Sequence, residues 1–481
     1  MNFESSLREI LPSESVLTSE EAKRPFECDA LSAYRQVPRV VVLPDKVEQV
    51  EQIVRLCKEH DVPIVSRGAG TSLSGGALPL AGGCVLSLAK FNKIKRVDPE
   101  KQIAVLEPGV RNIAISEAAR RHGLYYAPDP SSQLACSIGG NVAENAGGVH
   151  CLKYGLTVHN LLKLKIITSE GEWIEVGNES LDCPDQDLLT LFTGSEGLLG
   201  IVMEITVKLL VEPVDARVML AAFREVEHAG QAVAGIIGAG VIPAALEMMD
   251  SLIINAVEDY CHAGYPRDAA AILLCEIDGS EQELNQQIEQ ITSLFEAHNS
   301  YEIKVSSSDE ERLLFWQGRK LAFPALGRIA PDYFCMDGTI PRHELGHVLG
   351  EIGALSVEYD LPVANVFHAG DGNLHPLIAY DANRDGELEK AEELGGKILE
   401  LCVAVGGTIT GEHGVGVEKL DQMCVQFNPA ELGIFHAVKD ALDPTHMLNP
   451  GKAVPTLHRC AELGGMHVHN GQLPHPELER F

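Results

Sequence analysis

Residues 67–76 read Arg67-Gly-Ala-Gly-Thr-Ser-Leu-Ser-Gly-Gly76 and follow the short apolar run Val62-Pro-Ile-Val65. Glycine is used where the backbone must approach a ligand closely or adopt a positive φ. Successive N–H groups of such a loop can form a concave anion site suited to a pyrophosphate, and Thr71 and Ser72 can add hydroxyl donors. Ordinary turn glycines are the alternative interpretation.

This stretch does not fit the dinucleotide-binding fingerprint. Residues 68–73 read Gly-Ala-Gly-Thr-Ser-Leu, so the third glycine of Gly-x-Gly-x-x-Gly is missing. No helix is expected to open there, and no acidic residue follows a second strand at the usual distance. We therefore exclude a classical NAD site.

Two more glycine-rich stretches lie downstream. Ser137-Ile-Gly-Gly-Asn-Val-Ala-Glu-Asn-Ala-Gly-Gly148 is the first, and Gly194-Ser-Glu-Gly-Leu-Leu-Gly200 is the second. The latter leads into the strand-like run 201–207. One such loop is weak evidence, but three of them between residues 67 and 200 favour a large phosphate-containing ligand.

Composition narrows the function class. Of the 481 residues 45% are hydrophobic, and 38 Lys and Arg against 69 Asp and Glu give a net charge of −31. This acidity argues against a nucleic-acid or anionic-membrane surface. The N-terminus shows no signal-peptide pattern, and no apolar run of about 18 residues predicts a membrane span. The twelve scattered cysteines predict reduced thiols and no iron–sulfur cluster, and we expect a cytoplasmic protein.

A histidine pair stands out in Val366-Phe-His-Ala-Gly-Asp-Gly-Asn-Leu-His375. Asp371-Gly372 is a strong two-residue hairpin signal, which would place His368 directly opposite His375 on one face. Two imidazoles so placed can share a divalent cation. Two half-buried histidines in a tight turn are the alternative, and the second polar cluster Gly411-Glu-His-Gly414 favours the metal.

Together these motifs resemble the FAD-linked oxidoreductases of the vanillyl-alcohol-oxidase type, in their D-2-hydroxyacid branch. The chain most resembles the catalytic subunits of bacterial glycolate oxidases, followed by D-lactate and D-2-hydroxyglutarate dehydrogenases. The resemblance runs from about residue 38 to residue 451. The residues that carry it are Pro63–Ser72, Pro128-Asp-Pro130, Ser137–Asn141, Asn145–Gly148, Tyr154-Gly155, Gly194–Gly197, the histidine pair and Gly411–Gly414.

The resemblance implies an α+β fold with a two-subdomain FAD-binding domain, an α+β substrate or cap domain and a helical C-terminal segment. The expected bounds are 1–37 for a helical lead-in, 38–213 for the FAD-binding domain, 214–425 for the substrate domain and 426–481 for the C-terminal segment and tail. Expected strands are 39–43, 62–65, 84–88, 103–106, 161–168, 172–176, 201–207, 244–249, 271–276 and 301–305, and expected helices are 46–60, 111–122, 226–239, 251–260, 280–297 and 386–404.

The resemblance also implies the noncovalent FAD contacts. Residues 67–72 would wrap the pyrophosphate, 130 and 137–141 would lie along the ribityl and isoalloxazine, and 145–148 and 194–201 would hold the remainder. The predicted FAD-binding residues are Arg67, Gly68, Ala69, Gly70, Thr71, Ser72, Pro130, Ser137, Gly139, Gly140, Asn141, Asn145, Gly148, Gly197, Gly200 and Ile201.

The expected chemistry needs a metal, a base and an anchor. His368, His375 and Glu412 form a two-imidazole, one-carboxylate set that does not choose among Zn, Mn and Fe(II). If 411–414 is extended, Glu412 and His413 point to opposite sides, and by resemblance His413 is the base. Arg319 matches the family's carboxylate-binding arginine. The alternatives are a surface Glu–His pair and a solvated basic helix.

Substrate size follows from two departures from the dicarboxylate-oxidising relatives. Cys335 stands where those relatives tend to have a lysine, and Leu377 stands where they tend to have an asparagine. A second carboxylate would find no partner, so a small monocarboxylate, glycolate or D-lactate, is predicted.

The resemblance implies separate electron-transfer subunits, one iron–sulfur and one flavoprotein-like, through which alone the chain would associate with a membrane. A non-catalytic flavin-binding assembly subunit and an FAD-dependent alkyl-transferring synthase remain alternatives. The histidine-rich tail 456–481 is interpreted as an ordered extension, because its spacing fits no standard zinc set.

Overall fold

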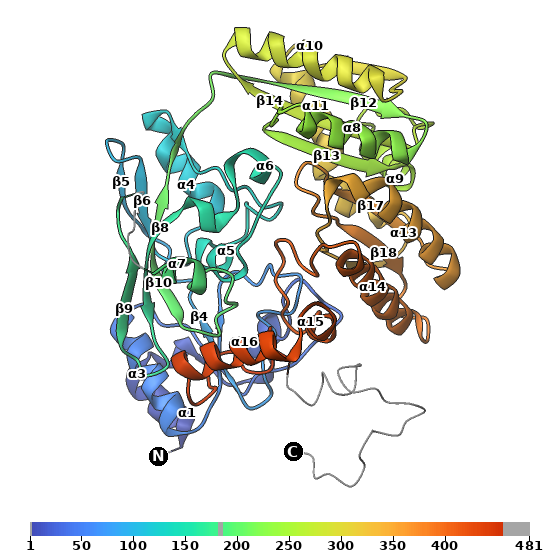
Figure 1. Ribbon diagram of the computed structural model, residues 1–481. Coiled ribbons are helices and arrows are strands. Elements are labelled where there is room, and N and C mark those ends of the chain that lie inside the picture. The colour runs from blue at the N-terminus through green and yellow to red at the C-terminus, as the bar shows by residue number, and fades with distance from the viewer. Residues whose placement is uncertain (1, 181–185, 456–481) are drawn as a thin grey trace. The chain divides into compact units, whose positions relative to one another are not determined.

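The computed structural model describes residues 2–180 and 186–455, so the predicted histidine-rich tail lies outside the described residues. The chain divides into two compact units (Figure 1). Unit 1 comprises Met1–Ala146, Leu156–Val211 and Glu412–Phe481, and unit 2 comprises Gly147–Gly155 and Glu212–Gly411.

Unit 1 contains a small sheet of order β1-β2-β4-β3, in which β4 is parallel to both β2 and β3. Helix α3 packs on it through Val50, Ile53, Val54 and Cys57, all fully buried, as the helical spacing of these residues predicts. Helix α1 packs on α3. The bounds are α1 Phe3–Ile10, β1 Val16–Leu17, α2 Glu20–Lys23, β2 Val40–Val42, α3 Val47–Glu59, β3 Ile64–Arg67 and β4 Cys84–Ser87.

A second, antiparallel sheet of unit 1 has the order β5-β6-β10-β8-β9. Its strands β8 and β9 correspond to the expected strands 161–168 and 172–176 and form a hairpin, with Gly171 at φ +73° in the turn. The bounds are β5 Ile94–Asp98, β6 Ile103–Leu106, α4 Asn112–Ala119, β7 Leu124–Tyr125, α5 Ile138–Glu144, β8 Leu161–Ile167, β9 Trp173–Gly177, α7 Leu188–Phe192, β10 Ile201–Lys208, β11 Leu210–Val211, α15 Leu420–Gln426 and α16 Pro429–Leu442.

Helix α5 was not expected, because the glycines of 137–148 were interpreted as a loop. Ser137 caps the helix by accepting a hydrogen bond from the Gly140 N–H at 3.4 Å, and Ile138 and Val142 fill the core beside the second sheet. Burial of these two side chains outweighs the helix-weakening effect of Gly139 and Gly140, each of which costs roughly 0.5–1 kcal/mol relative to alanine.

Unit 2 is a seven-stranded sheet of order β15-β12-β14-β13-β17-β18-β16 in which every recorded pairing is antiparallel. The strand bounds are β12 Asp215–Phe223, β13 Ala245–Asp250, β14 Ala271–Gly279, β15 Glu302–Val305, β16 Asp332–Cys335, β17 Val363–His368 and β18 Pro376–Tyr380. The helix bounds are α6 Cys151–Tyr154, α8 Val226–Gly238, α9 Ser251–Cys261, α10 Glu281–Ala297, α11 Asp309–Lys320, α12 Ala322–Leu326, α13 Leu345–Tyr359 and α14 Glu387–Ala404.

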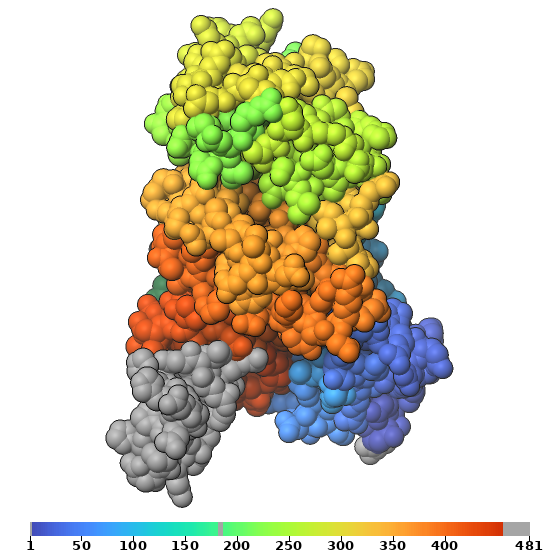
Figure 2. All heavy atoms as spheres, turned by 90° about the vertical axis from the view of Figure 1, so that its right-hand side faces the viewer, coloured from blue at the N-terminus to red at the C-terminus, as the bar shows by residue number. Residues whose placement is uncertain are grey.

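Helices cover both faces of this sheet. Helices α9, α11 and α12 share one apolar cluster with alternate residues of β13, β17 and β18. Helices α13 and α14 pack on each other and against β17 and β18, respectively, and they form the orange surface of unit 2 in Figure 2.

The register of the histidine hairpin differs from the prediction. Strands β17 and β18 pair Ala364 with Leu377, and His368 pairs with Asn373 rather than with His375. Gly372 has φ +80° but Asp371 does not have a positive φ, so the two-residue turn that requires both does not form. The register is therefore shifted by two residues. A shift of two preserves the faces of the strands, and both histidines still lie on one side.

The structure also bears on the predictions about the cysteines and about membrane-spanning helices. Nine cysteines within residues 2–180 and 186–455 form no disulfide, as predicted, but Cys424 is disulfide-bonded, so the prediction of reduced thiols is wrong for that residue. Among the helices within residues 2–180 and 186–455, none combines the length and apolar character that crossing a bilayer requires.

Candidate active site

The first two glycine stretches lie against each other in unit 1. A Cβ added at Gly68 would sit 2.2 Å from the Ser137 Oγ at the start of α5. Gly70 has φ +72°, and a Cβ there would lie 2.1 Å from the Arg67 guanidinium. Glycine is therefore required at both positions, by space at Gly68 and by space and backbone conformation at Gly70.

The third glycine stretch joins the other two. Gly194 and Glu196 donate their N–H groups to the carbonyls of Val142 and Ala143 near the end of α5. A Cβ at Gly197, which has φ +71°, would lie 2.7 Å from the Ser66 Oγ on β3. The structure thus brings together in unit 1 three stretches that are far apart in sequence.

Several predicted cofactor residues have structural partners of their own. The Arg67 guanidinium donates to the Cys28 carbonyl at 2.8 Å, and burial lowers the pKa of this arginine. Asn141 accepts from the Asn112 side chain at 3.1 Å, and Asn145 ends α5 in the left-handed conformation while accepting from the Val158 N–H. These side chains stabilise the glycine stretches, and Ile201 is buried in β10.

Pro130 and Gly148 each make local contacts of their own. The Pro130 carbonyl accepts from the Gln133 N–H within a turn. Gly148 belongs to the segment 147–155 of unit 2, where Lys153 and Tyr154 both bind the carboxylate of Asp278 on β14.

Sequence analysis missed a buried charge cluster beside the glycine stretches. Glu196 accepts the N–H groups of Val415 and Gly416, both at 2.7 Å. Burial raises the pKa of Glu144 well above its usual value, and the charge of Glu196 adds to this rise. Burial also lowers the pKa of Lys452 to about 8, although neighbouring carboxylates oppose that change. Lys452 donates to the carbonyl of Gly76, the last residue of the first glycine stretch, and to that of Leu78, and so helps to fix the path of the chain there.

In unit 2 the alternation of the strands gathers polar side chains on one face. Ala245 and Met249 of β13, and Ala364 and Val366 of β17, all belong to the apolar cluster under α9, α11 and α12. Because side chains two residues apart share a face, three polar residues point to that same side. They are Glu247 on β13, His368 on β17 and His375 before β18.

The two histidines meet inside the protein. Their rings are 5.0 Å apart between centroids and are inclined by 80°, and the two residues are 4% and 3% exposed. His368 Nδ1 lies 2.7 Å from Glu247 Oε1. Burial alone would raise the pKa of Glu247, but the charges of His368 and Arg319 lower it below its usual value. The ionised carboxylate accepts a hydrogen bond from Nδ1–H, and in the neutral imidazole this leaves the lone pair on Nε2 for a ligand.

Glu412 follows directly on the last residue of unit 2. The Gly411 N–H donates to the Asp337 carbonyl at 2.9 Å and to its carboxylate at 3.0 Å. His368, His375 and Asp337 are candidate metal ligands of unit 2, and Glu412 and His413 begin the last segment of unit 1.

The backbone around Glu412 is not extended, as the sequence analysis had supposed it to be. Residues 411–413 form a bend rather than extended backbone. Glu412 and His413 accordingly do not point to opposite sides, because His413 Nε2 lies 3.9 Å from Glu412 Oε1.

Arg319 is not a solvated helix residue. Its side chain is 3% exposed in the described structure, whereas the adjacent Lys320 is exposed. Its Nε donates to Glu247 Oε2 at 2.8 Å. Its Nη2 is buried and has no hydrogen-bond partner among the described residues. A buried unpaired guanidinium N–H is costly, so this donor points to an anionic ligand.

Sequence analysis missed Glu247 and Asp337. Glu247 lies in Ala245-Leu-Glu-Met-Met249, where one carboxylate interrupts an apolar strand. A charge at a buried position requires a charged partner, so this interruption was the available signal. Asp337, which is fully buried, lies 3.5 Å from His375 Nε2.

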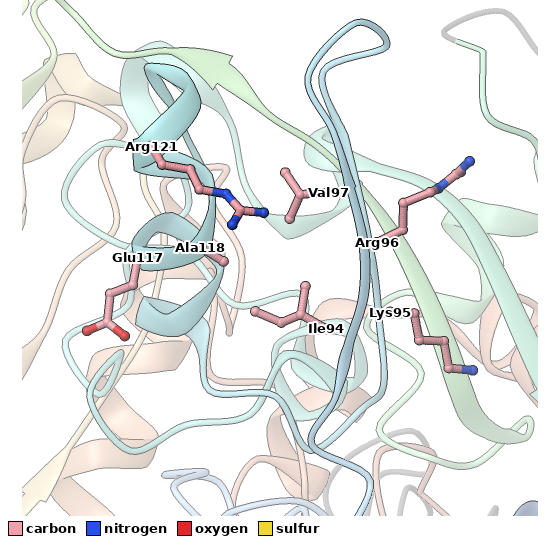
Figure 3. A pocket seen from close by; sticks show the side chains of 7 residues that line it. All are labelled: Ile94, Lys95, Arg96, Val97, Glu117, Ala118 and Arg121. Atoms are coloured by element: carbon pink, nitrogen blue, oxygen red, sulfur yellow. The ribbon is translucent and has the colours of Figure 1, made fainter.

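The cavity drawn in Figure 3 lies in unit 1 and is not lined by the polar residues of the histidine cluster. It has a volume of about 550 Å³ and lies between β5 and α4, with Ile94 and Val97 facing Arg121. Lys95 points away from it and is paired with Glu204. Neither a catalytic pair nor a histidine lines it.

The comparisons with known proteins match both units. Residues 38–177 match the family described as FAD binding domain, and residues 212–453 match FAD linked oxidases, C-terminal domain. The chain belongs to the FAD-linked oxidases. It is therefore an FAD-dependent oxidoreductase, and the predicted FAD cofactor is confirmed.

Curated relatives of this FAD-linked oxidase cover almost its whole length. It is 60% identical to glycolate oxidase subunit GlcD of Escherichia coli over 476 residues, which are 99% of this chain and 95% of the relative. Identity to GlcD of Bacillus subtilis is 37%, over 89% of this chain and 91% of that protein. The D-lactate dehydrogenase of Anaerostipes hadrus is 31% identical, with coverage of 92% and 95%.

Solved structures support the fold of this FAD-linked oxidase. A p-cresol methylhydroxylase structure aligns with a TM-score of 0.81 at 16% identity, covering 95% of this chain and 97% of that one. An alkyldihydroxyacetonephosphate synthase aligns with a TM-score of 0.72 at 17% identity, covering 94% and 84%. These likenesses show the fold alone. They confirm the predicted α+β fold of the vanillyl-alcohol-oxidase type.

Proposed function

We propose that this FAD-linked oxidase oxidises a small D-2-hydroxy acid, with glycolate, which yields glyoxylate, as the preferred substrate. The observation that carries the proposal is the buried group in which Glu247 holds both His368 and Arg319 beside His375. The identity to the two GlcD relatives supports glycolate as the choice.

The residues of unit 1 fit an FAD pyrophosphate. Gly68 and Gly70 let the Ser137 and Arg67 side chains pack closely against the loop, and successive backbone N–H groups of such a glycine-rich loop can bind a pyrophosphate. The residues proposed to bind FAD are those that the resemblance implies, from Arg67 to Ile201.

The histidine cluster fits a divalent cation. His368 and His375 offer nitrogens and Glu412 offers an oxygen as ligand atoms. This mixture of imidazole and carboxylate suits Zn, Mn or Fe(II) and leaves positions open for substrate. When they are bound, the flavin accepts the hydride from the substrate α-carbon, and the metal lowers the pKa of the substrate hydroxyl.

The chain's own residues then have distinct roles. Arg319 binds the substrate carboxylate through the part of its guanidinium that Glu247 does not use. His413 accepts the hydroxyl proton, which is general-base catalysis by an imidazole. Removing that proton allows the α-carbon to release a hydride and become a carbonyl carbon.

The apolar residues at neighbouring positions of β16 and β18 support a small substrate. Cys335 and Leu377 are a directly opposed pair across β16 and β18, and both are buried in the apolar cluster. A second carboxylate near them would find neither a cation nor an amide from these two positions. This supports glycolate or D-lactate rather than a dicarboxylate.

Reduced flavin must pass its electrons on. The free cysteines among the described residues form no ligand cluster that could hold iron and sulfur. We therefore propose an iron–sulfur subunit and a flavoprotein-like subunit as partners of a cytoplasmic protein. The printed description of the GlcD relatives as oxidase subunits supports an assembly.

An anaerobic titration tests the substrate. Glycolate, D-lactate, L-lactate and D-2-hydroxyglutarate are added separately to the purified FAD-loaded chain, and bleaching of the oxidised flavin absorption is recorded. Bleaching by glycolate at the lowest concentration is expected. Preference for D-lactate would support the second candidate, and bleaching by L-lactate alone would contradict the proposal.

A scaffold role is the remaining alternative, in which the flavin is bound but does no chemistry. Under that alternative the ligand variants His375→Ala and Glu412→Ala would leave turnover in the assembled complex unchanged. We expect both to abolish turnover while the flavin stays bound.

A further inference from the structure

Glu247 occupies a position that neither the hydride transfer nor the metal ligation explains by itself. Its carboxylate is fully buried in the middle of β13. The sheet register places it directly opposite His368 on β17. One oxygen lies 2.7 Å from His368 Nδ1, and the other lies 2.8 Å from Arg319 Nε on α11.

This arrangement is not needed to join the two strands. Asp250, at the other end of β13, already binds β17 through the backbone and side-chain N–H groups of Asn365, both at 2.8 Å. Asp250 also caps α9 by accepting from Ile253. A fully buried carboxylate is costly to desolvate, so Glu247, on a strand pair that Asp250 already joins, calls for another explanation.

We propose that Glu247 is a positioning residue that fixes the distance between the metal-holding imidazole and the carboxylate-binding guanidinium. The hydroxyl and carboxylate of a 2-hydroxy acid sit on adjacent carbons, so the groups that bind them must keep a constant separation. A single carboxylate that holds both groups supplies that constraint. The inference rests on the proposed function.

The chemistry of the side chain explains why glutamate is required. Both partners are N–H donors, so each oxygen must accept. A glutamine has one accepting oxygen, and its NH₂ group would face a donor on the other side. An aspartate keeps the charge but is one methylene shorter, so it cannot reach the strand histidine and the helix arginine together.

The decisive variant is Glu247→Gln, compared with Asp250→Asn as the matched control on the same strand pair. Both are prepared as full-length FAD-loaded protein. Zn²⁺ and Mn²⁺ affinities are measured by calorimetric titration of metal-free protein. The carboxylate anchor is probed separately through the inhibition constant of acetate, which carries no hydroxyl, and steady-state kinetics give KM and kcat for glycolate.

We expect Glu247→Gln to weaken metal binding by about 10–100-fold, as loss of the group that orients a ligating histidine does. The acetate inhibition constant and the KM for glycolate should rise together by about 10-fold, because Arg319 loses its fixed position. At saturating metal and glycolate, kcat should fall by much less than these affinities. The Asp250→Asn variant should lose thermal stability but keep the metal affinity, the acetate inhibition constant and the KM for glycolate of the parent.

Glu247→Asp is the second variant, and it should show the same two losses to a smaller degree. A folded Glu247→Gln protein with metal and acetate affinities unchanged from the parent would overturn the inference. So would Glu247→Gln and Glu247→Asp proteins that both fail to fold, since the role would then be structural. A parent protein that binds neither metal would instead overturn the metal-dependent function proposed above.

Discussion

The glycine stretches of unit 1 depend on the backbone, whereas the histidine cluster of unit 2 depends on side chains. At Gly68 and Gly70 the site is made by the absence of a Cβ, and the backbone approaches its surroundings closely. In the histidine cluster, Glu247, Arg319 and His368 work through buried side chains from three elements. The glycine stretches should therefore be damaged by added atoms, and the catalytic and ligand-binding side chains by removed ones.

The largest effect is expected where one side chain performs a chemical step. His413→Asn should lower kcat for glycolate by about 10²–10⁴-fold, the usual contribution of a general base. Flavin and metal contents, measured by absorption and elemental analysis, should stay at parent levels. A variant that keeps parental kcat would remove His413 from the chemistry.

Arg319→Lys tests whether geometry or charge matters in the cluster. The variant keeps a positive charge but loses the planar fork, so kcat/KM for glycolate should fall by about 10–100-fold, given about 1.5–3 kcal/mol for a hydrogen bond to a charged group. Lys320→Arg is the control, because Lys320 is exposed on the same helix. An Arg319→Lys protein with the kcat/KM of the parent would show that the positive charge alone is enough.

Gly70→Ala tests the glycine stretches, where an added atom should do the damage. The added methyl would clash with Arg67 and force alanine into φ +72°. The left-handed conformation costs roughly 1–2 kcal/mol for a non-glycine residue, so the dissociation constant of FAD should rise by about 10-fold. Fluorescence of released flavin on dilution measures it, with Gly123→Ala, at φ +68° in an open turn, as a control for backbone strain alone.

The smallest effect is expected for Thr71→Ala. If backbone N–H groups dominate FAD binding, losing one hydroxyl donor should weaken it by less than about fivefold, since a single hydrogen bond contributes about 1 kcal/mol. The same flavin-release assay applies. A loss larger than that of Gly70→Ala would contradict the contrast drawn between the two regions.

Local patterns made much of the fold predictable. The helical spacing of Val50, Val54 and Cys57 predicts α3, and alternation with turn residues predicts the β8–β9 hairpin. Helix α5 was missed because its glycines indicate a loop, and only the burial of Ile138 and Val142 favours the helix. The hairpin register was wrong because Asp371 does not adopt the positive φ that its turn motif suggests.

In the candidate site, too, some features could be predicted from the sequence and others depend on tertiary contacts. The sequence by itself determined where glycine is required and which residues can hold a metal or a carboxylate, because those are properties of single residues and short motifs. Only the tertiary structure decided that Glu247 faces His368 and reaches Arg319. That outcome depends on β13 and β17 being neighbours in the sheet and on α11 covering the same face, and no pattern within about 20 residues encodes these long-range pairings.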